Sequence, residues 1–309
     1  MNILKKCVVV YNPHSGKHNK KMWFRDKFSE ILSLHGYKTI FLRSKRKEHI
    51  IDIVHNLNDD IDLVISIGGD GTFNESIRGN FLREKRLVLA HLPNGTTNDV
   101  GTMYGYGRDL IANLKMLLEG EIRKVDIITI NNIPSIYVCG FGKYLNIPYL
   151  TSGEDKKKFG YLAYIWNAFR EFFKITKMRE ITYEVNGEKY HGYYSFMFCS
   201  NSTRIAGLQN IFNDIKLNDN KFEVLFCNIA SRKKLINSLL SLATNDINHV
   251  SGLYYYKTGE VKIHIDNKKA TEWDIDGEKV DIEEEDIDIK LDNDTCLMIP
   301  KKNIDKLFV

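Results

Sequence analysis

The first 125 residues alternate short apolar runs with longer segments in which apolar side chains recur every three or four positions. Continuous apolar runs are typical of strands buried on both faces of a parallel sheet, whereas the wider spacing indicates amphipathic helices. The runs predict strands over Cys7–Tyr11, Lys38–Leu42, Leu63–Ile67 and Leu87–Leu92. The spaced segments predict helices from Trp23 to Leu34 and over Glu48–Leu57, Phe73–Phe81 and Leu110–Leu118. This order predicts a doubly wound, mostly parallel α/β sheet with a ligand crevice at the carboxyl ends of its strands.

The pattern changes after residue 125, where short segments rich in β-branched and aromatic residues alternate with turn sequences. These segments predict strands over Asp126–Ile130, Ile136–Cys139, Ile181–Val185, Tyr190–Cys199, Phe222–Cys227, Gly252–Tyr256 and Glu260–Ile265. Only Tyr161–Phe173 and Arg232–Leu242 show helical spacing here. We expect a mostly antiparallel β-sandwich over residues 126–290. The α/β domain would then cover residues 1–125 and be completed by residues 291–309.

Composition narrows the class of protein without identifying a function. The chain has 309 residues and a formal net charge of only +4, which gives no support for nucleic-acid binding. The five cysteines lie far apart and mostly in apolar runs, as expected for reduced thiols in a cytoplasmic protein. No apolar run is long enough for a signal peptide or a membrane-spanning helix, so we expect a soluble or peripheral protein. The histidines show no metal-ligand spacing, and His91 is expected to be buried in a strand.

Residues 68–72 form the most informative short segment of the chain. The apolar run Leu63–Ile67 ends in Gly68-Gly69-Asp70-Gly71-Thr72, and helical spacing follows. Glycines let the backbone approach a ligand closely, and the amides at a helix start bind phosphate. Asp70 has the wrong charge to touch phosphate directly, but a carboxylate suits Mg²⁺ or its bound water. The alternative interpretation is a tight turn from strand to helix with an acidic cap.

A second polar loop follows the next predicted strand. It reads Pro93-Asn94-Gly95-Thr96-Thr97-Asn98-Asp99, and both loops can open at the same edge of a parallel sheet. Threonine hydroxyls and Asn98 could bind phosphate oxygens, and Asp99 would add a second carboxylate beside Asp70. Taken alone, this segment is equally an ordinary polar loop that carries helix caps.

The loop after the first strand adds further polar groups, namely Asn12, Ser15, Gly16 and Lys17. The lysine could neutralise a phosphate as a point charge. The chain contains no Gly-x-x-x-x-Gly-Lys-Ser/Thr sequence and no Gly-x-Gly-x-x-Gly after the first strand. A P-loop enzyme is therefore excluded, and a dinucleotide oxidoreductase is disfavoured.

Together the three loops resemble the diacylglycerol kinase catalytic-domain family of lipid kinases, and its soluble bacterial branch in particular. The family pattern combines Asn-Pro-x-Ser-Gly, Gly-Gly-Asp-Gly-Thr-x-Asn-Glu and Pro-x-Gly-Thr-x-Asn-Asp, which occur here within 12–17, 68–75 and 93–99. The resemblance continues to Asp276-Gly277-Glu278 and so covers nearly the whole chain. The glycine turn also occurs in NAD kinases and phosphofructokinases, but Asn74-Glu75 and the Asn-Asp pair of the second loop favour lipid kinases.

The resemblance implies a kinase that uses ATP and Mg²⁺. Asp70, Asp99 and Asp126 match acids that organise Mg²⁺ through water, and Glu278 matches the family's general base for the lipid hydroxyl. From the residues alone, Asp126 is a strand-end residue, and the sequence around Glu278 is an ordinary hairpin turn. The resemblance assigns nucleotide binding to Asn12, Ser15, Gly16, Lys17, Ser44, Gly68, Gly69, Asp70, Gly71, Thr72, Asn74, Glu75, Gly95, Thr96 and Asn98.

Two departures from the family pattern affect the site. The family has Asp-Asp-Gly where this chain has Asn218-Asp219-Asn220, which weakens the second, structural Mg²⁺ site that the resemblance implies at Asp219. Thr97 stands where the family usually has glycine, and it adds a hydroxyl and a Cβ near the phosphates.

The resemblance also implies a lipid partner at the membrane surface. The enzyme would be cytoplasmic and peripheral at the inner face of the membrane, and a homodimer is compatible with the sequence. Diacylglycerol is the first expected acceptor, while phosphatidylglycerol, undecaprenol or a sphingoid base fit the same motifs. Two alternatives stay open: a kinase of a soluble substrate, similar to NAD kinases, and a catalytically weak regulator that binds nucleotide or lipid.

Overall fold

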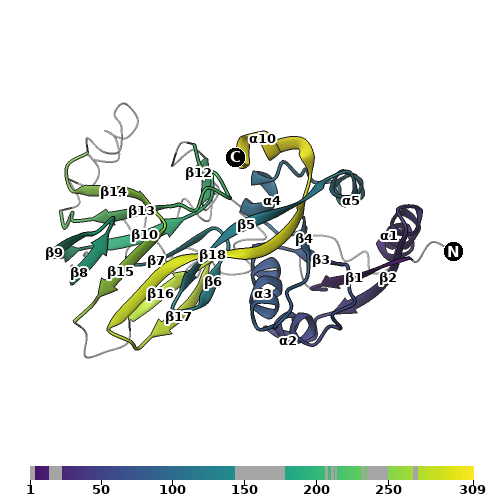
Figure 1. Cartoon of the computed structure of the whole chain (residues 1–309), viewed down its shortest axis with the longest axis horizontal. Helices are drawn as coiled ribbons and strands as arrows, with labels where there is room; N and C mark the ends of the chain where they lie inside the picture. Colours follow the sequence, from purple (N-terminus) through teal and green to yellow (C-terminus); the bar gives the residue numbers. More distant parts are fainter. Residues whose placement is uncertain are drawn as a thin grey trace.

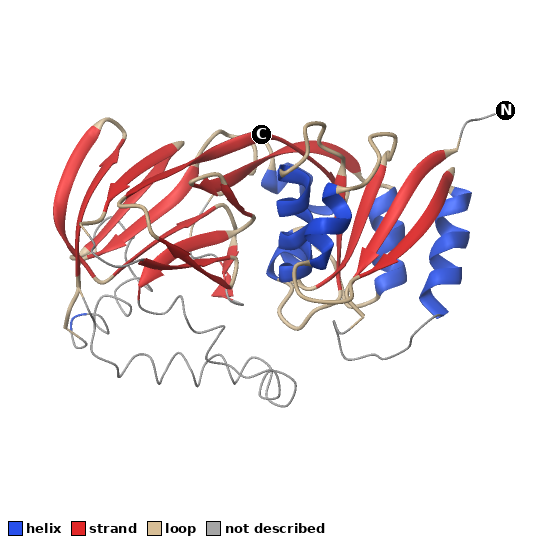
Figure 2. Cartoon of the chain, turned by 90° about the horizontal axis from the view of Figure 1, so that it is seen from below, coloured by secondary structure: helices blue, strands red, loops and turns tan. Residues whose placement is uncertain are grey.

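The computed structural model describes residues 4–13, 23–142, 178–205, 208–209, 212, 214–231, 234, 250–266 and 271–309. Several predictions lie outside these residues: Ser15, Gly16 and Lys17, the helix over Tyr161–Phe173, and all but Lys234 of the helix over Arg232–Leu242. Figures 1 and 2 show an N-terminal region with helices packed around a sheet and a C-terminal region built of strands.

The N-terminal region is the predicted α/β domain. Its parallel strands lie in the order β2-β1-β3-β4. They are β1 (Lys5–Tyr11), β2 (Tyr37–Arg43), β3 (Leu63–Gly68) and β4 (Leu89–Pro93). The helices are α1 (Trp23–Leu34), α2 (His49–His55), α3 (Asp70–Phe81), α4 (Asp99–Met103) and α5 (Leu110–Leu118). Every residue of β3 and β4 is buried, which explains their unbroken apolar runs.

One long strand, β18 (Asp286–Ile299), connects the two regions, as Figure 1 shows. It pairs in parallel with β4 at Leu297, and it pairs antiparallel with β5 (Glu121–Ile130) and with β15 (Glu260–His264). A single ten-stranded sheet therefore runs through both regions. The division of the chain at residue 125 stays a prediction.

The C-terminal region is a sandwich of two antiparallel layers, as predicted. One layer is the antiparallel part of the large sheet, with β8 (Arg179–Val185), β9 (Glu188–Tyr194), β15 and β18. The other layer has the order β14-β13-β10-β7-β16-β17. Its strands are β7 (Val138–Gly142), β10 (Phe196–Ser200), β13 (Phe222–Cys227), β14 (Leu253–Thr258), β16 (Thr271–Ile275) and β17 (Glu278–Ile282). The rings of Tyr183 on β8 and Phe226 on β13 stack with centroids 3.8 Å apart, so the core lies between the layers.

Short elements complete the described fold. They are β6 (Ile133–Ser135), β11 (Arg204–Ile205), β12 (Leu208–Gln209), the 3₁₀ helix η2 (Lys301–Asn303) and α10 (Ile304–Leu307). Of these, β6 pairs with β5 at the edge of the large sheet. No helix in the described residues is both long and apolar enough to cross a membrane.

The elements at residues 190–199 and at the start of α3 have other boundaries than predicted. Residues 190–199 form two strands rather than one, because β9 belongs to the large sheet and β10 to the second sheet. At the join, the amide of Ser195 donates to the carbonyl of Cys227 at 2.7 Å. α3 begins at Asp70 rather than at Phe73, so the glycine turn is also the first turn of the helix.

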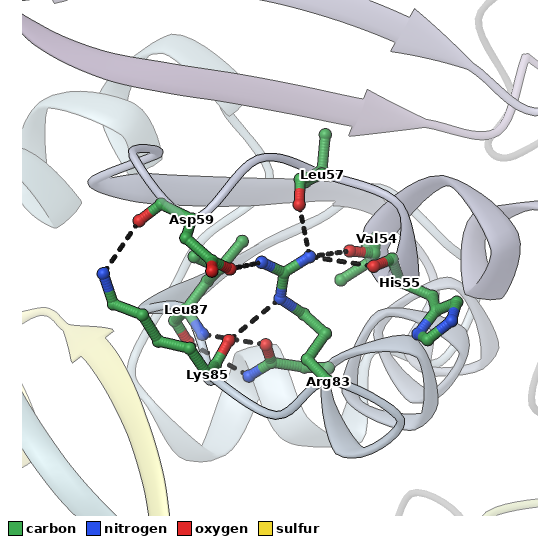
Figure 3. Close-up of polar contacts among 8 residues, drawn as sticks. Val54, His55, Leu57, Asp59, Arg83, Lys85 and Leu87 are labelled. Carbon is green, nitrogen blue, oxygen red and sulfur yellow. Dashed lines mark hydrogen bonds and ion pairs between the residues drawn. The ribbon is translucent and has the colours of Figure 1, made fainter.

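A buried arginine fixes the end of α2, and Figure 3 shows its contacts. The side chain of Arg83 is only 4% exposed. Its guanidinium donates to the carbonyl oxygens of Val54 (3.1 Å), His55 (2.9 Å) and Leu57 (2.6 Å), and it forms an ion pair with Asp59. A cation is favourable at a helix C-terminus, where carbonyl groups lack partners. The opposite end of α2 lies at the candidate active site.

Candidate active site

The glycine turn and the second polar loop contact each other at the carboxyl ends of β3 and β4. The amide of Asn94 donates to the carbonyl of Gly68 at 2.6 Å. A Cβ on Gly95 would lie 2.5 Å from the Cα of Gly69, so the contact requires glycine. A Cβ on Gly71 would meet nothing within 4 Å. A ligand can therefore approach the first turn of α3 over Gly71, beside the point where the loops meet.

The side chain of Asn98 bonds to the backbone of Gly95 within the second loop. Its backbone is left-handed, with φ of +53°, and its side chain accepts from the amide of Gly95 (2.7 Å) and donates to the carbonyl of Gly95 (3.0 Å). These contacts use only one of the two N–H donors of the side chain, and its role in nucleotide binding stays a prediction. Thr96 in the same loop is exposed, whereas Thr72 in α3 is buried.

Asp70 caps the helix that follows the second loop. Its carboxylate accepts hydrogen bonds from the amides of Asp99 (3.0 Å) and Val100 (3.1 Å), at the start of α4. Burial, and next the charge of Asp99, raise the pKa of Asp70 to about 7. A nearby cation stabilises the charged form of such a carboxyl group. The acidic cap and the cation site are therefore compatible interpretations of Asp70.

Asn74 links α3 to the strand-built region through a buried carboxylate. It donates to Asp276 at 2.7 Å, and both side chains are buried. Asp276 also accepts from the amides of Ile136 (2.6 Å), Tyr137 (3.0 Å) and Val138 (3.1 Å). Because these amides bond to Asp276, β7 begins at Val138 rather than at the predicted Ile136.

From the sequence, the only role expected of Asp276 is in the hairpin turn, and the turn is present. The φ values of Asp276 (+52°) and Gly277 (+82°) are both positive, as a type I′ hairpin requires. Glu278 follows as the first residue of β17, with its side chain 38% exposed, and contacts the ammonium group of Lys47 at 2.5 Å. No local signal could have identified Asp276 as buried, because the amide of Ile136 lies 140 positions earlier in the chain.

Glu75, next to Asn74 on α3, is bonded to the loop between β2 and α2. Its carboxylate accepts from the amides of Glu48 (3.1 Å) and Ile50 (3.2 Å) at the start of α2. Burial is the main cause that raises the pKa of Glu75. Glu75 therefore caps α2, and its assignment to nucleotide binding stays a prediction.

Comparison with known proteins identifies the N-terminal region. Residues 6–130 match the family model of the diacylglycerol kinase catalytic domain. This part of the chain is similar to a diacylglycerol kinase catalytic domain. The match indicates a kinase, a transferase that passes phosphate to an alcohol.

The chain is similar to several relatives and solved structures over most of its length. A diacylglycerol kinase from Staphylococcus aureus (strain bovine RF122 / ET3-1) is 26% identical over 275 residues, covering 89% of this chain and 86% of the relative. The same figures hold for the diacylglycerol kinase of strain MRSA252. Two structures from Bacillus anthracis str. Sterne share the fold. One, of a diacylglycerol kinase, has a TM-score of 0.73, 17% identity and coverage of 97% and 98% of the two chains. The other, of a candidate diacylglycerol kinase, has a TM-score of 0.81, 18% identity and coverage of 98% of both chains.

The family resemblance groups Asp70, Asp99 and Asp126 around Mg²⁺, but in the structure Asp126 has other hydrogen-bond partners than Asp70. Asp70 lies beside Asp99, whereas Asp126 on β5 accepts from the amide of Asn220 at 2.7 Å. Burial is the main cause that raises the pKa of Asp126, and the charge of Asp219 adds to it. Among the described residues, no three Asp, Glu, His or Cys side chains are arranged to hold a metal ion. The shared Mg²⁺ network stays a prediction.

Asp219 has a lysine as its cationic partner. The ammonium group of Lys257 lies 3.0 Å from Asp219 and 3.6 Å from Glu223. The neighbouring Asn218 accepts from the amide of Val309 at 2.9 Å, so it faces the C-terminus of the chain. Lys257 therefore already supplies positive charge at Asp219, and the structural Mg²⁺ predicted there stays a prediction.

Asn12 and Ser44 lie at the same sheet edge as the two glycine loops. Asn12 follows β1, and its amide donates to the carbonyl of Ile67 at 3.5 Å. Ser44 follows β2 and is buried, and its amide donates to the carbonyl of Tyr11 at 2.9 Å. The parallel strand order thus brings both residues toward the glycine turn, while contact with a nucleotide stays a prediction.

Proposed function

We propose that this protein transfers the γ-phosphate of ATP, with Mg²⁺, to the hydroxyl of a lipid alcohol, and that the alcohol is diacylglycerol. The observation that carries the proposal is the contact of two glycine loops beside Asp70 and Asp99. Through the bond from Asn74 to Asp276, the same helix also holds the hairpin that bears Glu278. The relatives from Staphylococcus aureus are named for this acceptor.

The nucleotide phosphates would lie over the first turn of α3. The amides at a helix start and the positive end of the helix dipole favour an anion at that position. The twelve residues of α3 make a full helix, and the open space above Gly71 leaves room for the ligand. The exposed hydroxyl of Thr96 comes from the second loop and could donate to the same phosphates.

The oxygen donors beside the loops fit Mg²⁺ that is held through water. Carboxylates are ligands that Mg²⁺ prefers, and the ion usually keeps several of its waters. Both oxygens of Asp70 already accept backbone hydrogen bonds, which favours contact through water over direct coordination. A cation nearby would counteract the burial and the charge of Asp99 that raise the pKa of Asp70, and would keep its carboxylate charged. When bound, Mg²⁺ would neutralise charge on the phosphoryl group during transfer.

Glu278 would accept the proton of the acceptor hydroxyl as that oxygen attacks phosphorus. Its carboxylate is partly exposed on a hairpin of the strand-built region, so the lipid would enter from that region and ATP from the α/β side. A positioned general base typically contributes about 10²- to 10⁴-fold in rate. The carboxylate must be charged before the hydroxyl attacks, so its environment matters.

Phosphate transfer from radiolabelled ATP to diacylglycerol in detergent micelles, with Mg²⁺ present, tests the proposal. We expect labelled lipid from the wild type and a loss of at least about 100-fold in Glu278→Gln. Glu272→Gln is the matched control, because it removes the same charge from the neighbouring strand, where Glu272 pairs with Lys279 at 2.7 Å. Full turnover by Glu278→Gln would reject the base, and label in NAD but not in lipid would favour a soluble substrate. ATP binding without transfer to any lipid alcohol would favour a regulator.

A separate variant tests where the nucleotide binds. Gly71→Ala adds a Cβ that meets no protein atom within 4 Å, and alanine is also the better helix former. We expect unchanged or slightly higher stability together with weaker ATP binding in calorimetry, because the new methyl group would meet only the phosphates. Unchanged ATP affinity would place the phosphates elsewhere.

The lipid acceptor implies that the enzyme works as a peripheral protein at the inner face of the membrane, in the cytoplasm. Flotation with vesicles that contain diacylglycerol tests this part of the proposal. Recovery of the protein only in the vesicle-free fraction would oppose it. Sedimentation of the purified protein would decide between a monomer and the homodimer that we also propose.

A further inference from the structure

Asn74 and Glu75 are adjacent residues of α3, and each bonds to one of the two segments that carry the ion pair between Glu278 and Lys47. Asn74 donates to Asp276, and two positions later in that hairpin lies Glu278. Glu75 accepts from the amide of Glu48, and directly before that residue lies Lys47. The carboxylate of Glu278 and the ammonium of Lys47 meet at 2.5 Å, although the two residues are 231 positions apart in the chain.

The loop that carries Lys47 is fixed at several points. The amides of Glu48 and Ile50 both donate to Glu75, and Glu48 has a left-handed backbone with φ of +62°. Just before Lys47, the amide of Lys45 donates to the ring of His49 at 3.0 Å. The loop therefore presents Lys47 in a defined position. On the other side, the buried bonds of Asp276 fix the hairpin of Glu278.

We propose that Lys47 is a positioning residue that orients the carboxylate of Glu278 toward the acceptor hydroxyl. This inference rests on the proposed function, in which Glu278 is the general base. It also gives Asn74 and Glu75 a role that needs no contact with the nucleotide: they bring the α/β loop and the hairpin together.

The charges around the pair explain why a cation is needed there. Besides Lys47, the charged groups close to the pair are two carboxylates: Glu75 interacts with the charge of Glu278, and Glu48 interacts with the charge of Lys47. Arg78 lies 3.7 Å from Glu48 and offsets part of that charge. The hydrogen bond to Glu278 is the largest influence on Lys47 and raises the pKa of the lysine. Removing Lys47 would leave Glu278 facing acids.

Steady-state kinetics with ATP and diacylglycerol test this role. Lys47→Met should lower kcat, because the carboxylate is less well oriented, and it should leave the KM for ATP unchanged, because Lys47 contacts Glu278 on the acceptor side. Both side chains of the pair are partly exposed, which limits the expected loss of kcat to about fivefold. We expect kcat to recover in Lys47→Arg.

Arg46→Met is the matched control. It removes a positive charge from the adjacent position, where Arg46 pairs with Asp52 and donates to the backbone carbonyl of Lys47 but does not pair with Glu278, so kcat should not change. Urea unfolding of each variant checks that the fold is intact. An unchanged kcat in Lys47→Met would overturn the inference and leave the proposed function standing. Higher turnover in Lys47→Met would also overturn it, because the lysine would then block the base. Full turnover in Glu278→Gln would instead reject the proposed function.

Discussion

Replacing Arg83 with methionine should destabilise the protein, because the guanidinium is almost fully buried and donates to the end of α2 (Figure 3). Methionine keeps much of the apolar stem and removes all the donors. The carbonyl of Val54 belongs to a buried residue and that of Leu57 to a half-buried one, so water replaces the lost bonds poorly there. His55 lies at the surface, and its carbonyl can be rehydrated.

The magnitude follows from the two acceptors that water cannot reach easily. A hydrogen bond to a charged group contributes about 1.5–3 kcal/mol net, and relief of the buried guanidinium charge offsets part of the loss. The exposed Asp59 adds little, since surface ion pairs contribute about 0–1 kcal/mol. We therefore expect Arg83→Met to lose about 2–4 kcal/mol of unfolding free energy.

Urea unfolding followed by circular dichroism measures this loss. Arg83→Lys should lose roughly half as much, because an ammonium group keeps some of the donors. Arg46→Met removes an exposed arginine and should change the free energy of unfolding by less than about 0.5 kcal/mol. If Arg83→Met loses less than about 0.5 kcal/mol of unfolding free energy, the guanidinium does not stabilise the end of α2 as proposed.

Three further predictions concern the site and its support. Gly95→Ala should push the second loop away from Gly69 and raise the KM for ATP by about tenfold or more, equivalent to about 1.4 kcal/mol; an unchanged KM would separate the loop contact from nucleotide binding. Asn74→Ala should lower unfolding free energy by about 1–3 kcal/mol and lower kcat as well, because Asp276 loses a buried donor; an effect on neither would contradict the link. Burial lowers the pKa of His91 from 6.5 to about 3, so its contribution to stability is present above pH 6.5 and lost as pH falls toward 3. Between pH 6.5 and 5 the wild type should lose up to about 2 kcal/mol that His91→Phe keeps, measured by urea unfolding at both pH values.

Local pattern was sufficient for elements in both regions. The helix predicted over Leu110–Leu118 and the strand predicted over Phe222–Cys227 have those bounds in the structure, because apolar periodicity and turn residues determine both. Residues 190–199 were predicted as one strand because the apolar pattern is continuous. Which sheet each half joins depends on distant strands, and no local signal carries that information.

The sequence by itself determined the resemblance to diacylglycerol kinases, the parallel α/β sheet and the two glycine loops, because each depends on short motifs and on hydrophobic periodicity. Only the tertiary structure decided what the polar residues of those motifs contact. It paired Asp70 with the start of α4, Asn74 with Asp276, and Lys47 with Glu278. The physical reason is that a buried carboxylate is stabilised by whichever donors the fold brings to it, and the donors to Asp276 come from parts of the chain more than 130 positions away.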